Sequence, residues 1–328
     1  MRVHFVYVGG SDNELHRAPY SITRNLGRCL RQHGFQVVDY EWDARLGGAD
    51  VKPDDIIIGH PNYPPDSALR VLWRYDCRAR FLIHPFHHGL PHINLPFDDL
   101  ASSANAILAI CGPYWFDTVS SSPFAHWRPR MVRLDMAVDA AAFPYLKTSF
   151  GPPGQRSYAY IGRDDLEKGT DILAEVFRRL PYSLHYYGTV NPNSPLLGLG
   201  NIHLHGWTDL NHEWMHDFAR QCDFVVATGR SDANPTSLLE GAAWGLIPLA
   251  SQECGYYIDA GDSQPAQLHV GGLSIHNLDF TVQRLCDYNL APEQDLLARS
   301  QLNRHLIESV YSWDRFCATV LSVLARWL

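Results

Sequence analysis

The sequence predicts an α/β protein that consists of two doubly wound parallel-sheet domains facing a cleft. Short apolar runs alternate with helical stretches, and this alternation is typical of parallel sheets covered by helices on both faces. A segment rich in Gly and Pro, residues 148–156, interrupts the alternation, which then restarts. A length of 328 residues also suits two domains. Ligands of such folds bind in the cleft between the domains.

The first domain is expected to cover residues 1–150. The amphipathic stretch at residues 21–33 predicts a helix that ends near Gly34. Strands are predicted where the chain is rich in Val, Ile, Leu and Phe, namely at residues 3–8, 36–40, 55–59, 80–83, 106–110 and 131–134. These strands would form one parallel sheet.

The second domain is expected to cover residues 151–311, after the Gly- and Pro-rich segment that we interpret as the linker. Strands are predicted at residues 157–161, 183–187, 201–205, 223–227 and 246–250. Helices are predicted at residues 170–179, 213–221, 236–244 and 294–308. The alternation again favours a parallel sheet with helices on both faces.

The charge of the chain is uneven. The net charge is −8, yet residues 1–150 contain 15 basic and 15 acidic residues, so the remainder carries all of the excess, 12 basic against 20 acidic. An acidic second half argues against nucleic acid as a partner, because binding a phosphate backbone needs a dominant basic face. The few basic residues within that half become candidates for a specific anion site.

The seven cysteines are scattered, odd in number and without a C-x-x-C spacing. This pattern is typical of reduced thiols in a cytoplasmic protein and argues against a disulfide framework or a zinc site. The N-terminal apolar run is too short for a signal peptide, and no run approaches the roughly 18–20 apolar residues of a spanning helix. We therefore expect a soluble, cytoplasmic protein.

Two cations stand in the loop expected after the strand at residues 157–161. Arg163 and Lys168 lie in the stretch Gly-Arg-Asp-Asp-Leu-Glu-Lys-Gly, and Lys168 is the only lysine in the second half of the chain. Sheets of this class present functional groups at the carboxyl ends of their strands. The same residues could form an ordinary solvated turn. They indicate an anion site only in combination with a second segment.

That second segment runs from Asp232 to Glu240, after the strand at residues 223–227. Pro235 suits the start of a helix, where its missing N–H is not needed. Three residues follow it: Thr236, Ser237 and Leu238. Their backbone N–H groups are expected to hold a phosphate, although the two hydroxyls could also be simple capping groups. Glu240 lies one turn on, where it could reach ribose hydroxyls, and Asp232 lies on the loop that would face a sugar.

These segments resemble the retaining glycosyltransferases of the GT-B architecture, in particular those of family 4. Gly162 and Arg163 followed by Lys168 resemble the Arg and Lys pair that binds diphosphate in that family. The stretch from Asp232 to Glu240 resembles its motif of two glutamates separated by seven residues. In this chain Asp replaces the first Glu and is shorter by one methylene.

Further features carry the same resemblance. Residues 241–248 resemble the helix of small residues, the glycine and the strand that follow the two-carboxylate motif. Trp207 and the two residues before it resemble a turn that packs beside the nucleotide base. Residues 311–315 resemble the start of a C-terminal helix, about 312–328, that packs back on the first domain. The resemblance is specific over residues 157–250 and weaker in the first half, where the family recognises its acceptors.

The resemblance implies a metal-independent hexosyltransferase that retains the anomeric configuration and needs no cofactor. The donor would be a nucleotide-diphosphate sugar, UDP-glucose or a related UDP-sugar, and the acceptor a saccharide or lipid-linked saccharide in polysaccharide biosynthesis. Arg163, Lys168 and the helix N-terminus would stabilise the departing diphosphate. Consistent with metal independence, no Asp-x-Asp motif occurs in the chain. The exact donor, the acceptor and the linkage stay open.

The first domain offers two further positions. Gly9 and Gly10 follow the first strand and resemble a glycine loop near the donor phosphates. His84 is closest to a family His that reaches the donor sugar or its leaving oxygen, and His88 is the alternative. Four histidines within nine residues could suggest a metal site, but their spacing matches no zinc pattern and we expect none.

Other functions stay compatible with the sequence. A nucleotide-sugar epimerase on the same scaffold would act without an acceptor, and a non-catalytic saccharide-binding protein would bind without turnover. The intact Arg163, Lys168 and Glu240 argue against the latter, whereas Asp232 leaves it some room. A dehydrogenase is disfavoured because the chain lacks G-x-G-x-x-G.

A row of arginines in the first half bears on partners. It consists of Arg70, Arg74, Arg78 and Arg80. We favour a solvated helix face for this row, with contact to anionic lipid as the alternative. Peripheral attachment to the inner membrane face therefore stays open, and the sequence does not predict an oligomeric state.

Overall fold

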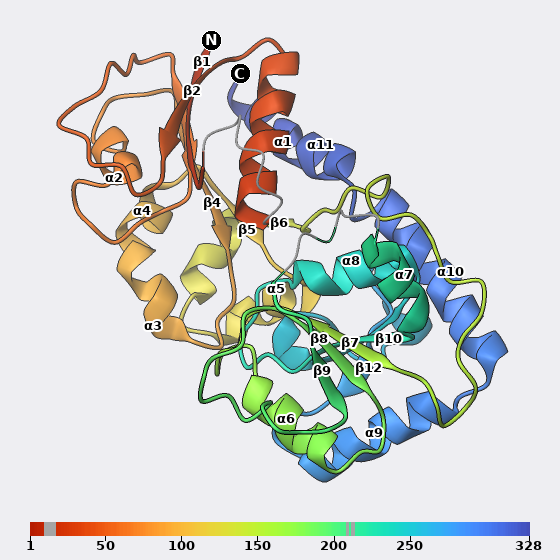
Figure 1. Ribbon diagram of the computed structural model, residues 1–328. Coiled ribbons are helices and arrows are strands. Elements are labelled where there is room, and N and C mark those ends of the chain that lie inside the picture. Colours follow the sequence, from red (N-terminus) through yellow and green to blue (C-terminus); the bar gives the residue numbers. More distant parts are fainter. Residues whose placement is uncertain (10–17, 208–209, 211–213) are drawn as a thin grey trace. The chain divides into compact units, whose positions relative to one another are not determined.

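The computed structural model describes residues 1–9, 18–207, 210 and 214–328. Within these ranges the chain forms two parallel six-stranded sheets flanked by helices, so the predicted α/β class is confirmed (Figure 1). The chain divides into two compact units. The first contains Met1–Cys111, Trp115–Asp135 and Trp313–Leu328, and the second contains Gly112–Tyr114 and Met136–Ser312.

The sheet of the first unit has the strand order β2-β1-β3-β4-β5-β6. Its strands are β1 (Arg2–Tyr7), β2 (Gln36–Glu41), β3 (Ile56–Gly59), β4 (Ala79–Pro85), β5 (Ala106–Ile110) and β6 (Met131–Leu134). The helices are α1 (Ala18–Gln32), α2 (Ala68–Leu72), α3 (Pro91–Asn94), α4 (Asp98–Ser103), α5 (Pro113–Thr118), whose first two residues belong to the second unit, and α11 (Trp313–Leu324).

The strands β3 and β5 are buried along their whole length, because each pairs with a strand on both edges and helices cover the faces of the sheet. The apolar stripe of α1, which includes Ile22, Leu26 and Leu30, is buried on the same unit. The C-terminal helix α11 packs against α1 and β6, and Figure 1 shows α1 and α11 side by side.

The sheet of the second unit has the order β12-β11-β10-β7-β8-β9. Its strands are β7 (Tyr158–Ile161), β8 (Leu184–Tyr187), β9 (Ile202–Leu204), β10 (Phe224–Ala227), β11 (Ile247–Ser251) and β12 (Gly271–Leu273). Its helices are α6 (Thr170–Arg178), α7 (Trp214–Gln221), α8 (Thr236–Trp244), α9 (Leu278–Leu290) and α10 (Glu293–Ser309). In Figure 1, α6 and α9 lie on one side of this sheet and α7 and α8 on the other.

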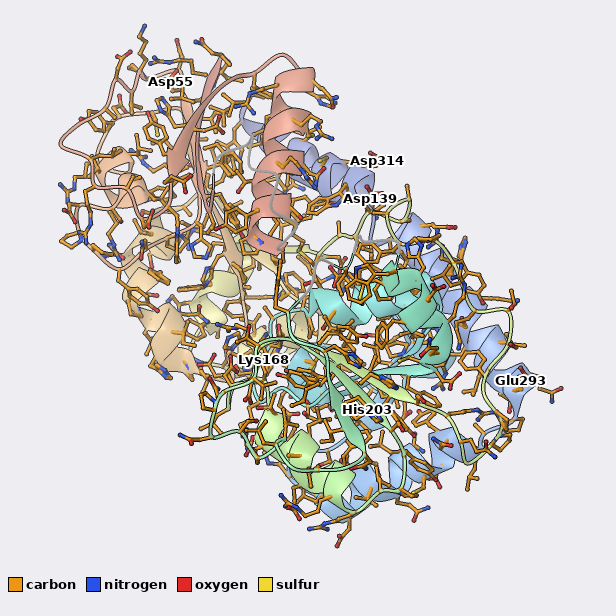
Figure 2. The ribbon with its side chains drawn as sticks, viewed as in Figure 1. Asp55, Asp139, Lys168, His203, Glu293 and Asp314 are labelled. Carbon is orange, nitrogen blue, oxygen red and sulfur yellow. The ribbon has the colours of Figure 1, made fainter. Side chains whose placement is uncertain are left out.

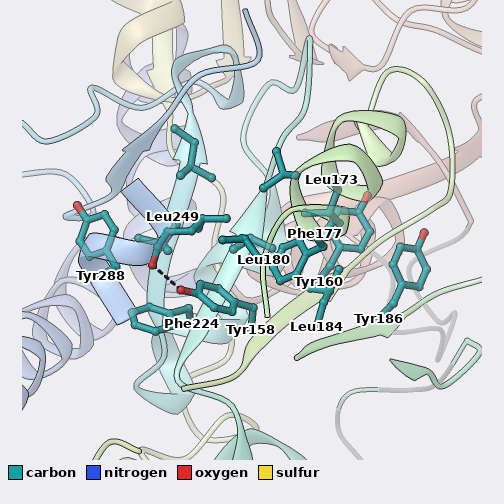
Figure 3. Packing of buried hydrophobic residues seen from close by; sticks show 14 of the residues in the cluster. Tyr158, Tyr160, Leu173, Phe177, Leu180, Leu184, Tyr186, Phe224, Leu249 and Tyr288 are labelled. Atoms are coloured by element: carbon teal, nitrogen blue, oxygen red, sulfur yellow. Dashed lines mark hydrogen bonds between the residues drawn. The ribbon is translucent and has the colours of Figure 1, made fainter. Parts of the chain in front are cut away.

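Aromatic rings pack through the core of the second unit (Figure 3). Tyr158 stacks on Phe224 of the neighbouring strand with ring centroids 4.8 Å apart, and Tyr160 stacks on Tyr186 at the same separation. The Tyr158 hydroxyl donates to the carbonyl of Leu285 at 2.7 Å, which satisfies a buried polar atom. This core supports the ends of β7 and β10.

The segment at residues 148–156, expected to be the linker, is instead fixed within the second unit. Directly before it, the Lys147 amine donates to the carboxylate of Asp223 at 3.0 Å and to the carbonyl of Cys222 at 2.9 Å. The side chains of Lys147 and Asp223 are only 3% and 4% exposed. Asp223 also accepts from the backbone N–H of Gly151 at 3.0 Å, so a buried ion pair anchors the start of the segment.

Arg156 anchors the far end of the segment. Its buried guanidinium donates to the backbone carbonyls of Asn289 at 2.9 Å and Ala291 at 2.7 Å, at the end of α9. The last carbonyls of a helix lack partners within the helix, and Arg156 supplies donors to them. The Gly and Pro content suggested a linker because it reveals backbone freedom but not the side chains that remove it.

The predicted strands and helices lie within three residues of their expected bounds where the structure describes them. In the first unit the short helices α2, α3, α4 and α5 were not predicted. In the second unit two elements were missed. The strand β12 contains Gly271 and Gly272, and glycine is depleted in strands. The helix α9 has a weakly amphipathic pattern, and its one clear signal is Asn277, whose side chain accepts from the Phe280 N–H at 3.0 Å as an N-cap.

Candidate functional site

The chain order of the second sheet reverses between β7 and β10. From β7 the chain builds β8 and β9 outward on one side, and then returns to add β10 directly beside β7 and continue to β11 and β12 on the other side. In open parallel sheets ligands bind outside the carboxyl ends of the strands at such a reversal. The loops at this point are residues 162–169, after β7, and residues 228–235, after β10; we name them the β7 loop and the β10 loop.

The two loops are in direct contact. The hydroxyl of Thr228 donates to the carbonyl of Gly169 at 2.9 Å, and the Arg230 N–H donates to the carbonyl of Glu167 at 2.8 Å. Gly169 has a φ of +67°, and a Cβ at this position would lie 1.9 Å from the Thr228 carbonyl oxygen. Only glycine meets both the backbone conformation and the close approach, so any side chain here would push the loops apart.

Lys168 and Asp232 meet at this point. The Lys168 amine forms an ion pair with Oδ2 of Asp232, and their side chains are 30% and 13% exposed. Burial lowers the pKa of Lys168, but the charge and hydrogen bond of Asp232 outweigh it, so the pKa is raised and the amine stays charged at neutral pH. Figure 2 labels Lys168, on the loop between β7 and α6. The two motifs that the sequence singled out thus converge.

Hydrogen bonds from their backbone N–H groups hold both Lys168 and Asp232 in place. The Lys168 N–H donates to the side chain of Asp165 at 2.7 Å, and the Asp232 N–H donates to the carbonyl of Glu253 at 2.9 Å. The β7 loop is further anchored by the buried carboxylate of Asp164, which accepts from the hydroxyl of Thr170 at 2.7 Å. The cation and the carboxylate therefore stand on ordered loops.

Arg163 extends from the same loop into solvent. Its side chain is 76% exposed and forms an ion pair with Asp165 at 3.4 Å. The neighbouring Gly162 N–H donates to the carbonyl of Tyr187 at 2.9 Å, which fixes the backbone but not the guanidinium. Among the smaller influences on the pKa of Lys168, the Arg163 charge lowers it, so the two cations lie within electrostatic reach of each other.

The helix α8 starts beside these loops, with Pro235 as its N-cap. Pro235 makes no side-chain capping bond, so the first N–H groups of the helix gain no partner from the N-cap side chain. The Leu238 N–H donates to the carbonyl of Pro235 at 3.2 Å, which removes it from the three N–H groups expected to face a phosphate. Glu240 lies one turn on and is half-buried. The N–H groups that are expected to bind a phosphate are therefore reduced to those of Thr236 and Ser237.

The turn at Gly206 and Trp207 packs on the end of β8. The Gly188 N–H donates to the Gly206 carbonyl at 2.9 Å, and the ring of His205 stacks on Tyr187 with centroids 4.5 Å apart. Trp207 is exposed. An exposed indole offers an apolar face on which a nucleotide base could stack, and contact of Trp207 with a base stays a prediction.

In the first unit, His84 occupies an enclosed position on β4. Its Nε2 lies 2.6 Å from Oδ1 of Asn94 and its Nδ1 lies 3.4 Å from Nε2 of His60. Burial lowers the pKa of His84 to about 4, so the imidazole is neutral at pH 7. The alternative, His88, contacts the hydroxyl of Thr118 at 2.8 Å. Contact of either histidine with a donor sugar stays a prediction.

Gly9, expected to form a loop near donor phosphates, follows β1 with a φ of +71°. Its N–H donates to the carboxylate of Glu41 at 2.8 Å. Gly10 lies outside the described residues.

The burial of His84 predicts a pH dependence of stability. The unfolded chain has a histidine pKa of about 6.5, whereas the folded chain excludes the proton down to about pH 4. The unfolded state therefore binds an extra proton as the pH falls through this window, and His84 costs about 1.4 kcal/mol of unfolding free energy per pH unit. Urea unfolding of the wild type at pH 7 and pH 5 measures the loss.

The same measurement on His84→Gln isolates this histidine, because the amide keeps a partner for Asn94 but cannot titrate. We expect a shallower pH dependence for His84→Gln. His305→Gln, at an exposed position on α10, is the control that leaves the dependence unchanged. An identical pH dependence in wild type and His84→Gln would contradict the argument.

Sequence reasoning missed residues whose role is to bind the loops together. His60 follows β3 and contacts His84, and Arg230 and Asp164 bind the β7 loop. Each lies within three residues of the end of a strand, which is the signal that could have identified them. Nothing in the sequence shows which loop each would reach.

The described residues contain no group of three or more His, Cys, Asp or Glu side chains that could hold a metal ion. The row of arginines does not form one helix face, because α2 ends at Leu72. Arg70 instead pairs with Asp99 at 2.7 Å, and Arg74 donates to the carbonyl of Pro65 at 2.7 Å. In the ranges that the structure covers, no helix is long and apolar enough to span a membrane.

Comparison with known proteins identifies the fold. Neither protein-family models nor curated proteins match the sequence. Solved structures match over nearly the whole chain. Sucrose-phosphate synthase from Thermosynechococcus elongatus gives a TM-score of 0.70 at 10% identity, covering 99% of this chain and 98% of that one.

Two further structures contain ligands. HepE from Anabaena, in complex with UDP and glucose, gives a TM-score of 0.66 at 10% identity over 99% of this chain and 100% of that one. The catalytic domain of starch synthase IV from Arabidopsis thaliana, bound to ADP and acarbose, gives 0.67 at 10% identity over 99% of both chains. The chain therefore has the two-domain Rossmann-like fold of GT-B glycosyltransferases, and this prediction is confirmed.

Proposed function

We propose that this protein is a retaining glycosyltransferase that moves a hexose from a UDP-sugar to a saccharide or lipid-linked saccharide acceptor. The coarser part of this function, a nucleotide-sugar glycosyltransferase in saccharide biosynthesis, has the support of the fold neighbours. Some of them were solved with UDP and glucose or with ADP and acarbose. The finer part rests on the residues of the chain itself.

One observation carries the proposal: Lys168 and Asp232 converge where the second sheet reverses its chain order. A cation and a carboxylate on adjacent ordered loops match the diphosphate and the sugar of a nucleotide-diphosphate sugar. Lys168 would take the diphosphate and Asp232 the sugar hydroxyls. The first N–H groups of α8 would bind a phosphate oxygen, and Glu240 the ribose.

The chemistry follows from where charge develops. When the bond between the anomeric carbon and the diphosphate oxygen breaks, negative charge grows on that oxygen. Lys168, Arg163 and the start of α8 would stabilise it from fixed positions. The acceptor hydroxyl would form the new glycosidic bond on the same face and pass its proton to the leaving phosphate oxygen. This route needs no protein nucleophile, and cations on the chain would do the work of a metal.

Calorimetry with UDP and with ADP, followed by a hydrolysis assay with UDP-sugars in EDTA, tests the proposal. We expect UDP to bind and one UDP-sugar to be hydrolysed slowly without a metal. The anomeric configuration of the product, read by NMR, should match that of the donor. Binding without turnover would favour a saccharide-binding protein, and epimerised nucleotide sugar would favour an epimerase. A chain that binds neither UDP nor ADP would contradict the proposed transferase.

The pair of Lys168 and Asp232 predicts an effect of opposite sign on binding and turnover. A bound diphosphate must replace Asp232 as the partner of Lys168 and must tolerate the nearby carboxylate. Asp232→Asn removes both obstacles, so the affinity for UDP should rise about tenfold. Turnover of the UDP-sugar should fall by about 10²-fold, because the carboxylate that is expected to hold the sugar is lost.

Calorimetry and the hydrolysis assay on one preparation measure both effects. Asp217→Asn, which alters an exposed carboxylate on α7 in the same unit, is the control and should change neither. Weaker UDP binding by Asp232→Asn would contradict competition between this carboxylate and the diphosphate.

A further inference from the structure

Arg230 joins the two loops of the candidate site. Its guanidinium makes a bidentate ion pair with Asp171 at the start of α6, and both N–O distances are 2.7 Å. Nη1 also donates to the carbonyl of Leu166 at 2.5 Å, and the Arg230 N–H donates to the carbonyl of Glu167 at 2.8 Å. Arg230 therefore directs its donors at the loop that carries Lys168.

The backbone on both sides of Lys168 is thereby bound to the β10 loop. The two carbonyls before it accept from Arg230, and the carbonyl of Gly169, after it, accepts from Thr228 at 2.9 Å. Since the neighbouring peptide groups are fixed, the point from which the Lys168 side chain extends is fixed as well. A shift of about 1 Å in a reacting group can lower a rate about 10²-fold.

The pair of Arg230 and Asp171 acts through its shape. The hydrogen bond from Arg230 lowers the pKa of the Asp171 carboxyl, so both groups stay charged near neutral pH. Their side chains are 38% and 37% exposed, so solvent screens the Coulombic attraction. What remains is two parallel hydrogen bonds in a planar fork, which set the distance and angle between the β10 loop and the start of α6, directly after the β7 loop.

We propose that Arg230 is a positioning residue that, together with Asp171, holds Lys168 where it meets the diphosphate of the nucleotide sugar. This inference rests on the proposed function and extends it to a residue whose donors are directed at the protein. The sequence motifs do not reveal it, because Arg230 acts on the loop of the other motif.

A double-mutant cycle with UDP as the probe tests this inference on the 328-residue chain. By calorimetry, Arg230→Gln should raise the Kd for UDP about tenfold. In a chain that already carries Lys168→Ala, the same change should alter Kd by less than about twofold, because Arg230 acts through Lys168. Asp171→Asn should give the same pattern from the other side of the pair.

Arg178→Gln is the matched control. It removes an exposed arginine–carboxylate pair with Glu175 on α6, the helix that also carries Asp171. It should leave the Kd for UDP unchanged. Thermal unfolding of each variant confirms that it folds. The expected pattern is thus loss of UDP affinity in Arg230→Gln and Asp171→Asn, only while Lys168 is present.

Two results would overturn the inference while the proposed function stands: equal weakening with and without Lys168, or no weakening by Arg230→Gln although Lys168→Ala weakens binding. Equal weakening would mean that Arg230 affects UDP binding independently of Lys168. No weakening by Arg230→Gln would mean that the ion pair of Arg230 and Asp171 does not position Lys168. A wild-type chain that binds no UDP would overturn both.

Discussion

Replacing Lys168 by Ala is expected to lower kcat/KM for the UDP-sugar by about 10²-fold or more while the fold stays intact. The amine is one of two cations on the β7 loop and lies beside Asp232 at the reversal of the second sheet. It would oppose the negative charge that grows on the leaving diphosphate, and this charge exists mainly in the transition state. The loss should therefore appear in kcat as well as in KM.

The measurement is steady-state hydrolysis of the UDP-sugar that the wild type turns over. Lys52→Ala, at an exposed lysine of the first unit, is the control for the loss of a positive charge and should keep wild-type activity. Circular dichroism and thermal unfolding verify the fold of both variants. Normal turnover by Lys168→Ala would remove the proposed mechanism.

Replacing Asp223 by Asn is expected to lower the free energy of unfolding by about 3–5 kcal/mol. The change leaves the buried amine of Lys147 without its counter-charge. It also weakens the hydrogen bond that the Gly151 N–H donates to the side chain of residue 223. A buried charge without a partner is costly because neither water nor an opposite charge compensates it. Urea unfolding of wild type and variant at pH 7 gives the difference.

Asp217→Asn provides the matched comparison. Its pair with Arg220 is exposed, at 76% and 54%, and such pairs contribute about 0–1 kcal/mol. We therefore expect the stability of Asp217→Asn to stay close to the wild type. A loss for Asp223→Asn no larger than that for Asp217→Asn would show that the buried pair does not anchor residues 148–156.

Most of the strands were predictable because helices cover both sheets. Strands such as β3 and β5 are buried along their length and appear in the sequence as continuous apolar runs. The strand β12 has no such run. Its Gly271 is required by packing, since a Cβ there would lie 2.4 Å from the Tyr288 hydroxyl. Tertiary packing therefore determines that residues 271–273 form a strand, and the local sequence preference does not predict it.

The candidate site was predictable as two motifs but not as one contact. Lys168 and Asp232 each follow a strand, which marks both as positions at the carboxyl edge of a sheet. The contact between Lys168 and Asp232 forms because β10 returns beside β7, and neither motif predicts this strand order. The same limit explains why the roles of Arg230 and of the Lys147 ion pair emerge only from the folded chain.

A crystal structure of the protein soaked with UDP tests the central claim most directly. The account predicts diphosphate oxygens at about 2.7–3.2 Å from the Lys168 amine, with the phosphate facing the N–H groups at the start of α8. In that structure Asp232 would no longer be the partner of Lys168. UDP bound elsewhere on the protein, with Lys168 still paired to Asp232, would contradict it.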